Sequence, residues 1–347
     1  MANPDRLLSP GKLPGDLLKS LLDRYITADP SVLIGPGIGR DAAAIRVDDT
    51  ALVVKTDPIT FATEDAGRYL INVNANDITC MGATPRWVLV TALFPERDTT
   101  PDLVERSFAS LARAAEEIGI ALVGGHTEIT IGLDRLILIG QMIGTCAPND
   151  LYDLAQAKPG DAVILASGIA IEGTAILARE ARATLEEVLD AETIDAAAGL
   201  LESPGISVLP AARALQSAGI AIRGLHDPTE GGIATALAEL SEATELGIEI
   251  DAGAIPILPE TRAVCEALGL DPLGLIASGA LLAVVASDDA TRAVRALDDA
   301  RILGARIGTL TSDPGQWLTH GGRREPLPVF EVDEIARYFA GTGAAAH

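Results

Sequence analysis

Residues 64–82 form the stretch that most constrains how this chain can fold. Apolar side chains recur there every three to four residues, which predicts a helix that packs one face on a core. These side chains are Tyr69, Leu70, Val73, Ile78 and Met81. Gly82 and Pro85 predict the end of the helix. Asp77 then lies in its last turn and a half, where the helix dipole disfavours a carboxylate unless a cation faces it.

Asp77 is one of six acidic residues that stand beside Gly, Pro or Thr in short polar breaks after apolar segments. The six are Asp41, Asp57, Asp77, Glu128, Asp227 and Glu230. For any one of them, a solvated surface residue is the ordinary interpretation. Six acids at such breaks indicate a site assembled from several loops on a rigid scaffold.

Composition limits the class of protein. The chain has 347 residues, enough for two domains, and with 48% hydrophobic but only 3% aromatic residues its core must consist of Ala, Val, Ile and Leu. A net charge of −23 argues against nucleic-acid and membrane partners. The three cysteines are far apart, which argues against a disulfide framework or zinc site. With neither a signal pattern nor a membrane-length apolar run, we expect a soluble cytoplasmic protein.

Patterning predicts two domains, residues 1–147 and 148–347, divided at the polar segment 148–160. For the first we expect an α+β fold, with helices at 13–26, 64–82 and 101–118 and strands at 42–47, 51–56, 87–94, 120–123 and 135–145. For the second, strands at 162–166, 220–223, 281–286 and 305–309 alternate with helices at 172–179, 184–201, 207–218, 233–243 and 332–339. This alternation is typical of an α/β domain.

Two glycine-containing breaks indicate a ligand. Gly124 and Gly125 follow a strand predicted to be short and buried, where they let the backbone approach a ligand closely. Residues 226–232 open a helix whose N-terminus is suited to bind phosphate. The alternative is an ordinary capping turn, with Thr229 as the cap and acids in the first turn.

Carboxylates on loops, a Gly-Gly pair and a helix N-terminus together fit a magnesium-nucleotide site without a P-loop. No G-x-x-x-x-G-K-[ST] loop is present, and the glycine cluster at 35–41 lacks the G-x-G-x-x-G spacing. Phosphoryl transfer requires positioning and charge neutralisation rather than a nucleophilic triad, and no triad is evident.

Six segments in order resemble the AIR synthase superfamily, which includes aminoimidazole ribonucleotide synthase, selenophosphate synthetase, thiamine-monophosphate kinase and the hydrogenase-maturation carbamoyl dehydratase. The segments are 37–43, 55–58, 73–85, 124–128, 158–161 and 227–232, which together span nearly the whole chain. Residues 227–232 and 271–278 are most similar to the hydrogenase-maturation branch.

The resemblance implies a homodimer formed through the first-domain sheet, with ATP and Mg²⁺ between the domains. The magnesium ligands would be Asp41, Asp57, Asp77, Asp227 and Glu230. The nucleotide would contact Thr56, Asn76, Gly124, Gly125, Thr127 and Thr229. The residues predicted to be catalytic are Arg40, His126 and Glu128.

The chain departs from the superfamily pattern at three places. Arg40 stands where relatives often have a second Asp, so that either one magnesium site is weakened or Arg40 itself clamps a phosphate. His126 replaces an Asp of the kinase-like members and is either a proton carrier or a structural residue. The segment at Ser278 lacks an acid often found there.

Two classes of function stay open. One is an ATP-dependent enzyme that activates an amide- or carboxylate-type oxygen, or a small-molecule kinase resembling thiamine-monophosphate kinase. The other is a nucleotide-binding protein that serves a maturation complex. The hydrogenase-maturation branch carries its carbamoyl group on a C-terminal cysteine, whereas the last cysteine here is Cys265, within a predicted helix. We therefore expect that this protein does not make the cyanide ligand on itself, and that it either uses a different acceptor or acts without a covalent carrier.

Overall fold

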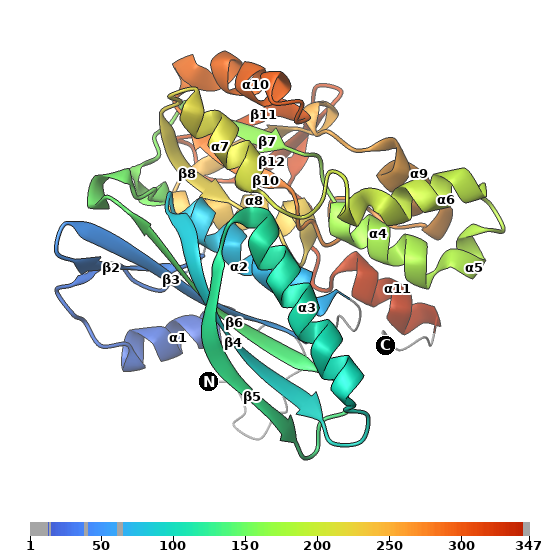
Figure 1. The fold of residues 1–347 in the computed structure, drawn as a ribbon. Coiled ribbons are helices and arrows are strands. Elements are labelled where there is room, and N and C mark those ends of the chain that lie inside the picture. Colours follow the sequence, from blue (N-terminus) through green and yellow to red (C-terminus); the bar gives the residue numbers. More distant parts are fainter. Residues whose placement is uncertain (1–12, 14, 38–40, 61–64, 343–347) are drawn as a thin grey trace.

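The computed structural model describes residues 13, 15–37, 41–60 and 65–342. The first domain contains a six-stranded sheet in the order β1-β2-β3-β6-β4-β5 (Figure 1). Its strands are β1 (Val32–Ile34), β2 (Ala43–Val47), β3 (Thr50–Ile59), β4 (Thr84–Pro95), β5 (Ala121–Thr130) and β6 (Ile137–Cys146). Neighbouring strands are antiparallel except β4 and β5, which are parallel because a helix connects them.

Two helices, α2 (Ala66–Cys80) and α3 (Pro101–Ile118), cover one face of this sheet (Figure 1). Thr100 caps α3 by accepting a hydrogen bond from the backbone nitrogen of Leu103 at 3.2 Å, and Gly119 ends it with a φ of 76°. The covered face supplies Val53, Val88, Phe94 and Met142 to the first-domain core. A further helix, α1 (Gly15–Tyr25), is mostly exposed, including Leu17, Leu18 and Leu21.

The opposite face of the first sheet is apolar and only partly covered. One cross-strand row joins Val54 on β3, Ile143 on β6 and Trp87 on β4, and Trp87 is 39% exposed. Leu52, Leu89, Ile137 and Ile139 lie on the same face and are half-buried. None of these side chains belongs to the first-domain core as the described residues define it.

The second domain contains a seven-stranded sheet in the order β13-β12-β9-β11-β7-β10-β8. Its strands are β7 (Ala162–Ala166), β8 (Ile222–His226), β9 (Gly247–Asp251), β10 (Leu281–Val285), β11 (Gly304–Thr311), β12 (Gln316–His320) and β13 (Arg323–Pro326). Its helices are α4 (Ile171–Glu180), α5 (Arg182–Leu185), α6 (Ala191–Ala198), α7 (Leu209–Ser217), α8 (Gly232–Thr244), α9 (Pro259–Leu268), α10 (Ala290–Asp299) and α11 (Glu334–Thr342). Within the sheet only β9 and β12 pair in parallel.

Helices bury both faces of the central strands β7 and β10 of the second sheet, whereas the edge strand β13 is exposed. Every residue of β7 and β10 is buried. On one face Val163 and Leu165 pack with residues of α4, α6, α8 and α9. On the other, Ala162 and Ile164 pack with α7 and α10. The two-domain architecture of mixed helices and sheets predicted from the sequence is thereby confirmed.

Several local predictions were wrong. The helix predicted at 184–201 is broken into α5, α6 and a 3-10 turn, because Asp190 accepts a hydrogen bond from Thr193 N at 2.7 Å and starts a new helix. The strand at 120–123 is not short and buried but continues as β5 to Thr130 along an exposed sheet edge. Asp57 and Glu128 therefore lie within strands, not in breaks after them.

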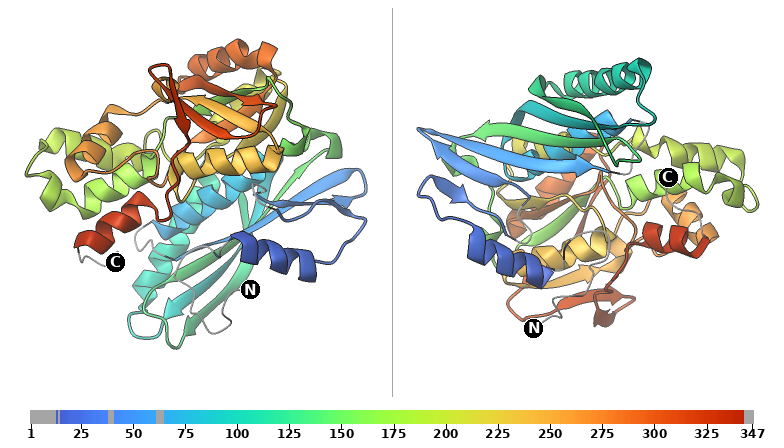
Figure 2. Two further views of the ribbon diagram at one scale, coloured as in Figure 1. Left: turned by 180° about the vertical axis from the view of Figure 1, so that it is seen from behind. Right: turned by 90° about the horizontal axis from the view of Figure 1, so that it is seen from below.

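Helix α2 lies between the first sheet and the second domain (Figure 2). Asn76 joins the two domains there: its side-chain nitrogen donates to the carbonyl of Ile206 at 2.9 Å, and its side-chain oxygen accepts from Val208 N at 3.0 Å. The polar middle of α2 is consequently buried at the domain junction. Among the described residues, no helix combines the length and apolarity needed to span a bilayer.

Candidate nucleotide and metal site

The cation that Asp77 needs at the C-terminal end of α2 is Lys55. Its ammonium nitrogen lies 3.0 Å from Asp77 Oδ2 and 3.6 Å from Asp57 Oδ2. Lys55 and Asp57 are two residues apart on β3, so strand alternation puts both on the face that α2 covers. Burial opposes the charge on Lys55, but the neighbouring carboxylates outweigh it and raise the pKa of Lys55 above its ordinary value.

The second domain adds Asp227, which follows β8, to this group. Ligand atoms of Asp41, Cys80 and Asp227 all lie within 4.8 Å of one another. The Cys80 Sγ is 3.6 Å from Asp227 Oδ1. Both domains thus contribute acids to one buried cluster at their junction.

A buried histidine completes the cluster. His226 Nδ1 lies 3.3 Å from Asp41 Oδ1, and Nε2 lies 3.1 Å from Glu239 Oε2 on α8. Burial alone would lower the pKa of His226, but the two carboxylates raise it well above its usual value. The ring lies between an acid of each domain, an arrangement that favours its protonated form.

The cluster carries more negative charge than Lys55 and His226 neutralise. Burial, followed by the charge of Asp227, raises the pKa of Asp77 well above its ordinary value. Burial, followed by the charge of Asp41, raises the pKa of Asp227 to about 7. A bound cation would remove this penalty, since it stabilises the ionised form of each carboxyl group.

The donor atoms fit a hard divalent cation. Asp41, Asp57, Asp77 and Asp227 offer carboxylate oxygens, the ligands that magnesium prefers. Burial raises the pKa of Cys80 far above neutrality, so its thiol stays protonated and is a poor ligand. A cavity of about 20 Å³ beside Asp41 and Cys80 has room for one water molecule or ion.

Comparison with known proteins places the chain in a family. The model for the AIR synthase related protein N-terminal domain matches residues 39–146, and the model for its C-terminal domain matches residues 158–320. The carbamoyl dehydratase HypE of Rhizobium leguminosarum bv. viciae is 35% identical over 294 residues, which cover 81% of this chain and 79% of that protein. The chain belongs to the AIR synthase-related family. The resemblance inferred from its six segments is thereby confirmed.

Solved structures show the same fold as this AIR synthase-related protein. A HypE–HypF complex superposes with a TM-score of 0.73 at 23% identity, covering 90% of this chain and 99% of that chain. A HypE in complex with ATP gives a TM-score of 0.70 at 24% identity, covering 94% and 97% of the two chains.

The AIR synthase-related fold keeps another group of predicted residues apart from the acid cluster. Gly124, Gly125, His126, Thr127 and Glu128 all lie on the edge strand β5, and β6 and β4 separate them from β3. His126 Nε2 is 3.1 Å from Glu128 Oε2, and both side chains are exposed.

The backbone at Gly124 and Gly125 has φ values of 150° and 147°, which favour glycine. A Cβ on Gly125 would also collide with the backbone of Val90. Thr56 lies on the open face of the sheet, opposite Lys55 and Asp57 in the strand alternation.

Glu230 and Thr229 belong to the loop between β8 and α8. Thr229 does not cap α8; the capping residue is Gly231, with a φ of 77°. The Thr229 carbonyl instead accepts from Gly232 N at 3.1 Å and Ala277 N at 3.2 Å. Glu230 lies close enough to Glu172 to influence its pKa, which burial raises to about 7.

The sequence prediction missed several residues of the site. Lys55 had a usable signal, because it stands two residues before Asp57 in a predicted strand. His226, directly before Asp227 at the end of β8, had a weaker one. Folding brings Glu239, Cys80 and Glu172 close to the site, and their positions in the sequence give no sign of it. Arg40 lies outside the described residues.

Proposed function

We propose that this protein binds magnesium-ATP at the domain junction and acts as a HypE-like enzyme of hydrogenase maturation, transferring a phosphoryl group to an oxygen of its substrate. The observation that carries the proposal is the cluster of Asp41, Asp57, Asp77 and Asp227, whose excess negative charge comes from both domains. The relative named carbamoyl dehydratase HypE and the HypE solved with ATP support it.

The chain's own residues would hold and orient the reactants. Asp41, Asp57, Asp77 and Asp227, with Glu230 from the adjoining loop, would hold magnesium, which when bound neutralises phosphate charge. Lys55 keeps Asp57 and Asp77 in place from within the first domain. His226 lies between Asp41 and Glu239 and thereby holds Asp41 in place.

Phosphoryl transfer at this site would form a bond from the substrate oxygen to the γ-phosphorus. The bond from that phosphorus to the oxygen bridging the β- and γ-phosphates breaks, and ADP leaves. We assign nucleotide contacts near the acid cluster to Asn76 and Thr229, and contacts away from it to Thr56 on the open sheet face and Thr127 on β5. The backbone of Gly124 and Gly125, also on β5, would line the phosphates. His126 and Glu128 are the proposed proton carriers, and their 3.1 Å contact suits that exchange.

The cysteines of the sequence are poorly suited to carry a carbamoyl group. Burial raises the pKa of Cys80 well above its ordinary value, that of Cys146 to about 11 and that of Cys265 to about 12. A thiol must ionise to be a good nucleophile near neutral pH. We therefore propose that the acceptor is a small molecule or a group on a partner protein.

The partners follow from the open sheet face and from the relatives. We propose a homodimer in which a second copy covers the apolar row of Val54, Ile143 and Trp87. Because a related HypE is solved in complex with HypF, we propose a maturation partner for this chain as well.

Titration calorimetry with a non-hydrolysable ATP analogue, with magnesium or with EDTA, tests the site. Asp77→Asn and Asp227→Asn should each weaken magnesium-dependent binding by at least about tenfold. Asp102→Asn is the matched control, because Asp102 is an exposed acid on α3 paired only locally with Arg106 at 3.2 Å. Wild-type affinity in both site variants would overturn the assignment. ATP turnover by the wild type separates an enzyme from a nucleotide-binding assembly protein.

A further inference from the structure

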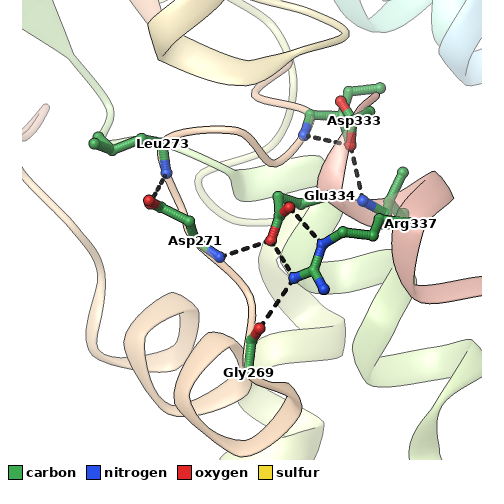
Figure 3. A network of polar contacts seen from close by, with 8 residues as sticks. Gly269, Asp271, Leu273, Asp333, Glu334 and Arg337 are labelled. Carbon is green, nitrogen blue, oxygen red and sulfur yellow. Dashed lines mark hydrogen bonds and ion pairs between the residues drawn. The ribbon is translucent and has the colours of Figure 1, made fainter. Parts of the chain in front are cut away.

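Three segments that are distant in the sequence pack together at the proposed metal ligands of the second domain. The first is the loop 227–232, which presents Asp227 and Glu230. The second is the segment 269–277, and the third is 330–337, which contains the start of α11. Figure 3 shows the contacts between the second and third segments.

The loop 227–232 rests directly on the second segment. Ala277 N donates to the Thr229 carbonyl at 3.2 Å, and Ala234 N donates to the Leu273 carbonyl at 3.0 Å. Gly232 has a φ of 65°, and a Cβ there would lie 2.5 Å from the Leu273 oxygen. The loop therefore has no room to shift unless the second segment shifts with it.

The start of α11 holds the second segment in turn. Glu334 Oε2 accepts from Asp271 N at 2.9 Å, and Glu334 N donates to the Gly274 carbonyl at 3.1 Å. Arg337 pairs with Glu334 at 2.6 Å and donates to the Gly269 carbonyl at 3.0 Å (Figure 3). A Cβ on Gly274 would collide with the ring of Phe330, so the packing there is tight.

Asp333 contacts all three segments through one carboxylate. Its Oδ1 accepts from Ile335 N at 2.9 Å and from Ile276 N at 3.3 Å. Its Oδ2 accepts from Gly231 N at 2.7 Å. Capping α11 requires only the bond to Ile335, so the bond to Gly231 serves the loop and not the helix.

We propose that Asp333 is a positioning residue of the nucleotide site, which holds Gly231 and thereby fixes the loop that presents Asp227 and Glu230. The inference rests on the proposed function, because it needs a cation bound at Asp227. Asp333 itself does not coordinate the cation; it acts through the backbone of the loop. The C-terminal helix is thus part of the site although it contributes no ligand.

The variant Asp333→Ser separates the two bonds. A serine hydroxyl at this position can still cap Ile335, but its side chain is shorter and it cannot also reach Gly231. We expect the magnesium concentration that gives half-maximal binding of the ATP analogue to rise about tenfold, as for other contacts that orient metal ligands. Asp333→Asn keeps one acceptor oxygen at the original length, so it should show a smaller rise.

Asp289→Ser is the matched control, because Asp289 also holds a distant backbone nitrogen, that of Ala221 at 2.7 Å, without touching the loop. In the Asp227→Asn background, Asp333→Ser should add little, since both changes act on the same ligand. Thermal unfolding without nucleotide shows whether Asp333→Ser folds. If it does not fold, the magnesium midpoint of Asp333→Asn tests the inference instead.

A folded Asp333→Ser protein with the wild-type magnesium midpoint would overturn the inference, as would full additivity with Asp227→Asn. Failure of the wild type to bind magnesium-ATP would instead refute the proposed function, so the two failures are distinguishable.

Discussion

The two sheets of the molecule differ in how their faces are covered. In the second domain, helices bury both faces of the central strands, and every residue of β7 and β10 is buried. In the first domain α2 and α3 cover one face, and the opposite face keeps a half-buried apolar row around Ile143. Exposed apolar patches of this kind usually mark partner surfaces, which supports the dimer proposed for the first domain.

The two domains also differ in how far their acidic side chains are buried, as Glu172 and Glu128 show. The second domain buries Glu172, and burial raises its pKa to about 7. The open sheet displays Glu128 on an edge strand, where hydrogen bonds from Thr130 and His126 lower its pKa. Glu172 of the closed domain is therefore sensitive to pH in the neutral range, and Glu128 of the open sheet is not.

The largest effect is expected from introducing a charge at the centre of a strand in each sheet. Ile164→Asp, on the fully buried β7, would bury an unpaired carboxylate at a cost of several kcal/mol, comparable with a total stability of about 5–15 kcal/mol. We expect no folded protein by circular dichroism. Ile143→Asp, on the open face, should fold and be monomeric by light scattering, whereas we expect the wild type to be a dimer.

Two results would break this part of the comparison. A wild-type monomer at micromolar concentration would mean that no second copy covers the open face. An Ile143→Asp protein that fails to fold would mean that the first sheet already buries both of its faces within one chain.

An intermediate effect is expected from Glu172→Gln. A folded pKa of about 7, above an ordinary value of 4.5, means that the folded state binds more protons than the unfolded state between these pH values. The contribution of Glu172 to stability is present below about pH 4.5 and is lost as the pH rises through 7. Removing the charge should therefore stabilise the protein at pH 8 by about 2–3 kcal/mol more than at pH 5.

Urea unfolding of both proteins at pH 5 and pH 8 measures this difference. Glu128→Gln is the control from the open sheet, and its exposed side chain should give no such change with pH. Equal pH profiles for wild type and Glu172→Gln would show that Glu172 is ionised in the folded protein.

The smallest effect on the fold is expected from His126→Gln. The side chain is exposed on β5, so the change in stability should stay within about 0.5 kcal/mol and the dimer mass should not change. ATP turnover should nevertheless fall if the imidazole carries a proton, and its pH profile should lose one limb. A marked loss of stability with unchanged turnover would make the pair of His126 and Glu128 structural.

The sequence by itself determined many of the local elements and the family. Apolar spacing located α2 and α3 almost to the residue, because each presents one apolar face to a core. Asp77 was identified as a carboxylate in need of a cation from helix geometry alone. The burial of β5 could not be predicted in this way. Its exposure depends on its position at the edge of the sheet, which the sequence pattern of a single strand does not report.

Only the tertiary structure decided which residues share a site. Lys55 reaches Asp77 because α2 crosses β3, and Asp227 joins them because the domains meet at α2. The tertiary structure likewise brings Asp333 to Gly231 across 102 residues of sequence. The physical reason is that hydrophobic periodicity reports which side of an element is buried, whereas ion pairs between elements depend on how those elements pack. Nothing in the spacing of two charged residues encodes that packing.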